Sequence, residues 1–118
     1  MDGVKIEIPA VPPSMNHFAG RQNAWEYREV KADWTRTVCL LCGRQKPTKP
    51  FDRAVVTITY RFADRRRRDP DNYCGKVIMD GLTAAGIIVD DSFDHVELRL
   101  RAEHPGKPRT TVEVIPID

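Results

Sequence analysis

The chain has 118 residues, of which 41% are hydrophobic and 31% are charged, and its formal net charge at pH 7 is +2. This composition is typical of a single globular domain, here residues 1–118, and excludes an intrinsically disordered chain. Because no stretch approaches the roughly 18 apolar residues of a membrane-spanning helix, and no basic and then apolar leader begins the chain, we expect a cytoplasmic protein with no membrane partner.

The amino-terminal half predicts a strand followed by a helix. Residues 4–8 alternate apolar and charged side chains with the period of two that is typical of a half-buried strand. Residues 14–23 are polar and contain Gly20, which predicts a surface loop. From about Ala24 to Gly43, apolar residues recur at steps of three and four and predict an amphipathic helix. These apolar residues are Tyr27, Val30, Trp34, Val38 and Leu41.

The carboxyl-terminal half predicts a strand, a helix and a β-hairpin. Residues 54–62 place apolar side chains on one face of a strand, and Asn72 is well placed to cap a helix over residues 73–85. Residues 96–101 and 110–115 alternate in the same way around a turn rich in proline and glycine, which predicts a hairpin. The order strand, helix, strand, helix, hairpin predicts an α+β domain with a mixed sheet and two helices packed on one face.

Basic residues are concentrated next to carboxylates. Between Arg61 and Lys76 six basic residues stand beside three acidic ones. A block of like charge is often only a solvated surface, but the neighbouring carboxylates favour a functional interpretation. The four consecutive basic residues are Arg65, Arg66, Arg67 and Arg68.

Two aspartates in this segment suggest a metal site. Asp69 and Asp71 are separated by one residue, so in extended backbone both carboxylates would project to one side. Mg²⁺ is usually held by one or two carboxylates together with substrate phosphate and water. Asp90 or Asp91 could supply a third carboxylate if the second helix returns the chain to the same end of the sheet. On residue types alone, a solvated charged loop is the commoner interpretation.

Lys76 and Asp80 lie one helical turn apart beside these carboxylates. Lys76 could stabilise charge on a phosphoryl transition state or orient the nucleophile, and Asp80 is a candidate to position it. Cys39 and Cys42 form a CxxC, but no second CxxC or HxxxH would complete a zinc site. We therefore interpret both as helix-packing residues, with a redox or metal role as the alternative.

The segment RRRRDPDN (65–72), followed by Lys76, Asp80 and GIIVDD (86–91), resembles the RusA family of Holliday junction resolvases. PPSMN, residues 12–16, is similar to that family's amino-terminal PPS-x-N loop, and the order of strands and helices agrees over nearly the whole chain.

The resemblance implies a homodimeric, magnesium-dependent endonuclease that cuts four-way DNA junctions by paired nicks, in a family common in phages and prophages. A two-fold dimer suits two symmetric nicks, which require two active sites. In the family pattern the lysine follows the second aspartate by four residues, whereas Lys76 follows Asp71 by five. The resemblance makes Asp69, Asp71 and Asp91 the metal ligands and catalytic carboxylates, Lys76 the essential lysine, and Arg65, Arg66, Arg67, Arg68 and Asn16 the DNA-binding residues.

Two other functions fit parts of this pattern. A non-cleaving protein that binds branched DNA would use the arginine run alone and would show affinity that falls steeply with salt. A small metal-dependent phosphohydrolase acting on nucleotides would use the carboxylates, but four consecutive arginines suit an extended phosphate backbone better than one small ligand.

Overall fold

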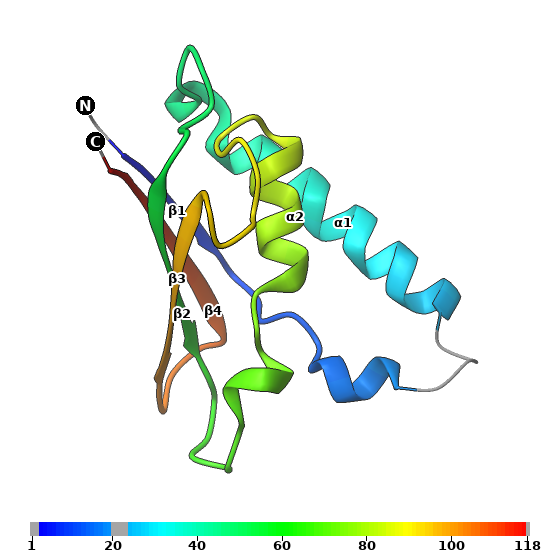
Figure 1. Ribbon diagram of the computed structural model, residues 1–118. Coiled ribbons are helices and arrows are strands. Elements are labelled where there is room, and N and C mark those ends of the chain that lie inside the picture. Colours follow the sequence, from blue (N-terminus) through cyan, green and yellow to red (C-terminus); the bar gives the residue numbers. More distant parts are fainter. Residues whose placement is uncertain (1–2, 20–23, 118) are drawn as a thin grey trace.

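A computed structural model describes residues 3–19 and 24–117, and its four strands form one mixed sheet (Figure 1). The strand order is β1-β4-β2-β3, in which β4 is antiparallel to both β1 and β2, whereas β3 is parallel to β2. The strands are β1 (Val4–Ile8), β2 (Ala54–Arg61), β3 (Val96–Glu103) and β4 (Arg109–Pro116).

Two helices, α1 (Ala24–Cys42) and α2 (Lys76–Ala84), pack against each other on one face of this sheet (Figure 1). They approach closely at Gly81, where an added Cβ would lie 3.0 Å from the Cβ of Val38. The predicted α+β domain with a mixed sheet covered on one face by two helices is therefore confirmed. Three short 3₁₀ helices complete the fold: η1 (Met15–Phe18), η3 (Gly43–Gln45) and η4 (Pro70–Asn72).

The predicted hairpin between the last two strands is wrong, because β2 lies between β3 and β4. The helix α2 connects β2 to β3, and a helical crossover is the connection that parallel neighbouring strands require. The chain must then pass the end of β2 to reach β4. The inward residues of β4, Thr110, Val112 and Val114, are fully buried, which suits a central strand, whereas β3 is largely exposed and lies at the edge.

The second helix begins later than predicted. Asn72 does not cap it; instead Asn72 ends η4, and α2 starts at Lys76 after Gly75, whose φ of 80° only glycine adopts at low cost. Residues 73–75 therefore form a non-helical link between η4 and α2.

The first helix ends at Cys42, next to Gly43, as predicted, but its buried stripe is shifted by one residue at this end. Leu41 is exposed, whereas Cys42 is buried in the core, so the packing role predicted for the cysteines is confirmed for Cys42 only. Trp34 packs against the core as expected. The predicted loop at residues 14–23 contains η1, and residues 20–23 lie outside the described residues.

The apolar core lies between the sheet and α2. The inward side chains of β2, which include Val56 and Ile58, are fully buried, as are Ile78 and Leu82 of α2. In the part of the chain that the structure describes, no helix is long and apolar enough to cross a membrane.

Candidate functional site

The two segments that resemble RusA are in contact. The backbone N–H of Asn16, in η1, donates a hydrogen bond to the side-chain oxygen of Asn72, in η4, at 3.1 Å. The short helices η1 and η4 therefore hold the PPSMN and RRRRDPDN segments together, although these residues are 56 positions apart in the sequence.

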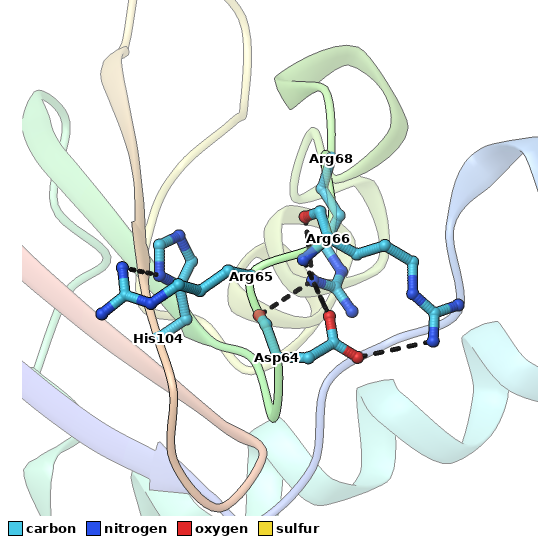
Figure 2. Close-up of polar contacts among 5 residues, drawn as sticks. All are labelled: Asp64, Arg65, Arg66, Arg68 and His104. Atoms are coloured by element: carbon cyan, nitrogen blue, oxygen red, sulfur yellow. Dashed lines mark hydrogen bonds and ion pairs between the residues drawn. The ribbon is translucent and has the colours of Figure 1, made fainter.

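Asp64 organises the start of the arginine run (Figure 2). Its Oδ1 accepts a hydrogen bond from the backbone N–H of Arg66 and another from Nη1 of Arg68, both at 2.9 Å. These donors, first the backbone N–H and then the guanidinium, hold the pKa of Asp64 below its ordinary value. The side chain of Arg65 points instead towards the β3–β4 connection, where its Nη1 lies 3.4 Å from Nδ1 of His104.

Arg68 differs from the three arginines before it. Its Nη1 also donates to the backbone oxygens of Asp64 and Arg66, at 3.2 and 3.1 Å, and its guanidinium carbon lies 4.2 Å from the centre of the Phe62 ring. Only 21% of its side chain is exposed. Arg68 thus stabilises the loop through these contacts. The sequence does not predict this role, because Arg68 is one of four consecutive arginines.

The preceding arginines remain available to a ligand. The side chains of Arg66 and Arg67 are 83% and 89% exposed, and the structure pairs them with Asp64 and Asp69 through single contacts at 3.5 and 3.2 Å. Exposed ion pairs of this kind contribute little stability and are easily exchanged for a phosphate.

An aromatic cluster packs next to this loop. Tyr73 makes edge-to-face contacts with Tyr60 and Phe62, with ring centres 5.7 and 5.1 Å apart. Burial raises the pKa of the Tyr60 hydroxyl well above its ordinary range. A small cavity of about 90 Å³ lies between this cluster and Asp69. The aromatic packing fixes the backbone on either side of the DPDN segment.

Lys76 is held by the carboxylate of Asp80, the contact expected from their spacing. Nζ of Lys76 lies 3.2 Å from Oδ1 of Asp80, and Nζ of Lys31, from α1, lies 3.3 Å from Oδ2. The hydrogen bond with Asp80 and then the charges of Asp80 and Asp91 raise the pKa of Lys76. Lys31 was not predicted, because nothing in the α1 sequence distinguishes it from a surface lysine.

A larger cavity, of about 760 Å³, opens beside Lys76 and Asp91. Hydrogen bonds from Ser92 and from the backbone N–H of Asp91 lower the pKa of Asp90. The Asp90 carboxylate is thus hydrogen-bonded to its own neighbours in the chain. Asp91 is exposed at the cavity instead. Of these two neighbouring aspartates, Asp91 is therefore the one that lines the cavity.

The three candidate metal ligands do not form one cluster. Within residues 3–19 and 24–117, no group of three or more histidine, cysteine, aspartate or glutamate side chains is arranged to hold a metal ion. Asp69 lines the small cavity, Asp91 lines the large one, and Asp71 is exposed on η4. The donor chemistry still fits Mg²⁺, which needs only one or two protein carboxylates when phosphate and water complete its shell.

A scan of known protein families finds no family model that matches this chain, and a search of curated proteins finds no match either. The RusA interpretation therefore depends on the motif residues and on where the fold places them.

Proposed function

We propose that the protein is a magnesium-dependent endonuclease that resolves four-way DNA junctions by paired phosphodiester hydrolysis. The observation that carries the proposal is that one loop, held by Arg68 and joined to Asn16 through Asn72, presents exposed arginines and two aspartates directly before the helix that carries Lys76.

The exposed arginines would bind the DNA backbone. Arg66 and Arg67 have the exposure and charge to contact phosphates on either side of the cut, and Arg65 is exposed on the side of the loop that faces His104. Phosphate contacts position the substrate without reading its sequence, so we expect recognition by junction shape. Asn16, which is exposed on η1, would extend this surface.

The carboxylates and Lys76 would act at the phosphorus. Asp69, Asp71 and Asp91 are the side chains that would hold Mg²⁺, which supplies charge neutralisation and an activated water when bound. Lys76 is an ammonium at neutral pH, and Asp80 raises its pKa further, so it can stabilise negative charge that develops on the phosphate. Asp80 and Lys31 act as positioning residues for Lys76.

Two copies would act together, because resolving a junction requires two symmetric nicks. We therefore propose a homodimer that acts on branched DNA in the cytoplasm, of a type found in phages and prophages.

The test is cleavage of a synthetic four-way junction in Mg²⁺, with a linear duplex of the same sequence as the comparison substrate. We expect the wild type to nick the junction in preference to the duplex, and Asp71→Asn to lose this activity while still binding. Asp33→Asn is the matched control, because Asp33 is an exposed aspartate on α1 whose side chain pairs only with Arg36 among the contacts described. Equal cutting by the wild type and Asp71→Asn, or no cutting by either, would contradict the proposal.

One observation favours a second candidate, a protein that binds branched DNA without cutting it: no three-ligand group is formed among the described residues. This candidate predicts junction binding that persists in chelator, weakens steeply with salt, and leaves the DNA intact at every Mg²⁺ concentration. Turnover of free nucleotides without junction cleavage would instead indicate a small phosphohydrolase.

A further inference from the structure

The strand β3 has one unpaired edge. All eight of its residues are in register with β2, from Ala54 opposite Val96 to Arg61 opposite Glu103, and no other strand among the described residues pairs with its second side. Such an edge presents unpaired N–H and C=O groups to solvent, and natural proteins usually shorten, bend or cover it. β3 is long and contains no proline, so it is suited to accept another strand.

Apolar side chains are exposed beside this edge. Phe93, just before β3, is 104% exposed, and Leu98, on the face of β3 that points towards the helix layer, is 39% exposed. Both line the cavity of about 760 Å³, together with Met79 of α2. The side chains on the same face of β2 are buried, whereas Leu98 of β3 is not fully covered by the helices. An exposed apolar patch that adjoins a free strand edge marks an interaction surface.

We propose that β3 pairs antiparallel with β3 of a second copy, joining the two sheets across a two-fold axis. This inference deepens the proposed function, since it takes the dimer from that proposal and locates its interface. In antiparallel pairing, the outward charged side chains of β3 face those of the partner's β3, and the inward apolar ones face each other.

The charges of β3, together with the position of the exposed Leu98, choose the register. Its outward side chains are Glu97, Arg99, Arg101 and Glu103. When Glu97 lies opposite the partner's Arg99, opposite charges meet twice because of the symmetry, and Leu98 meets the partner's Leu98 on the inward face. Pairing Glu97 with the partner's Arg101 would instead place Arg99 opposite the partner's Arg99 on the axis. A shift that puts Glu97 opposite the partner's Glu103 also puts Arg99 opposite the partner's Arg101, and every outward pair repels.

The arrangement has a functional consequence. A two-fold axis between antiparallel edge strands runs perpendicular to the joined sheet, so both helix layers lie on the same side of it. The cavities that contain Lys76 and Asp91 then open on one side of the dimer. Two active sites on one side can reach one junction together.

The test is sedimentation velocity of the full chain over a range of concentrations, without DNA or metal. We expect a dimer for the wild type. Glu97→Arg and Arg99→Glu should each weaken it by about tenfold or more, because each creates two like-charge contacts across the axis. The double variant Glu97→Arg/Arg99→Glu should recover the wild-type dimer, since it restores opposite charges at both positions.

Leu98→Lys provides a second variant at the apolar face and should also weaken the dimer. Leu40→Ser is its matched control, because Leu40 is 79% exposed on α1, away from β3. Circular dichroism establishes that each variant is folded. A monomeric wild type at all soluble concentrations would overturn the proposal, as would a dimer insensitive to the single charge reversals or one that the double variant does not restore. Loss of cleavage with an intact dimer would instead count against the nuclease proposal alone.

Discussion

Replacing Gly75 by alanine would test how the backbone brings Lys76 to the start of α2. Gly75 has a φ of 80°, and a Cβ built there would lie 2.6 Å from Cδ1 of Ile58 and 3.8 Å from the Tyr60 hydroxyl. Two costs therefore add: the left-handed backbone, about 1–2 kcal/mol, and overpacking against a fully buried isoleucine, about 1–3 kcal/mol. Alanine also restricts the unfolded chain, which offsets about 0.4–1 kcal/mol. We expect Gly75→Ala to lower the free energy of unfolding by about 3 kcal/mol.

The chain offers controls that separate the two costs. Gly43 also has a positive φ, 31°, but a Cβ there would meet nothing within 4 Å, so Gly43→Ala should cost about 1 kcal/mol or less. Ile58→Val removes the very atom that the new Cβ at position 75 would strike, and should by itself cost about 0.5–1.5 kcal/mol. In the Gly75→Ala/Ile58→Val double variant, the overpacking is relieved. The double variant should therefore lose less free energy of unfolding than the sum of the losses of the two single variants.

Urea denaturation of the four variants and the wild type measures these differences directly. A loss for Gly75→Ala no greater than that for Gly43→Ala would refute the close contact with Ile58. Strict additivity of Gly75→Ala and Ile58→Val would refute it independently.

Three further predictions concern the site loop and the cysteines. Asp64 has a lowered pKa in the folded state, so its contribution to stability is complete above its ordinary pKa of 3.8 and is lost as the pH falls through the lower folded value. Acid titration of the free energy of unfolding should show this contribution in the wild type and not in Asp64→Asn. Arg67→Ala should reduce the salt slope of junction binding by about one without changing stability, whereas Arg68→Ala should lower the melting temperature, and the reverse pattern in binding and thermal melts would contradict their assignment. Alkylation at pH 8 followed by mass spectrometry should label Cys39 well before Cys42, whose buried thiol has a pKa raised to about 11, and equal rates would show that Cys42 is not shielded.

Periodic patterns in the sequence determined the elements and their buried faces. The alternation in residues 4–8 predicts β1 at the bounds observed, and the alternation in residues 96–101 and 110–115 correctly assigns the last two strands. It does not assign their neighbours, because a period of two records which side of a strand is buried and not which strand lies beside it. The hairpin prediction was wrong for this reason. The exposed edge of β3 is seen only when β2 is placed between β3 and β4.

The candidate site divides in the same way. The sequence by itself determined which residue types are concentrated between Asp64 and Lys76, and the spacing of Lys76 and Asp80 already predicted their contact. Only the tertiary structure decided that Arg68 is committed to Phe62 and the loop backbone, and that Lys31 shares the Asp80 carboxylate. Like residues in one run are indistinguishable until packing gives each of them different neighbours, and a contact between helices depends on how two distant segments cross.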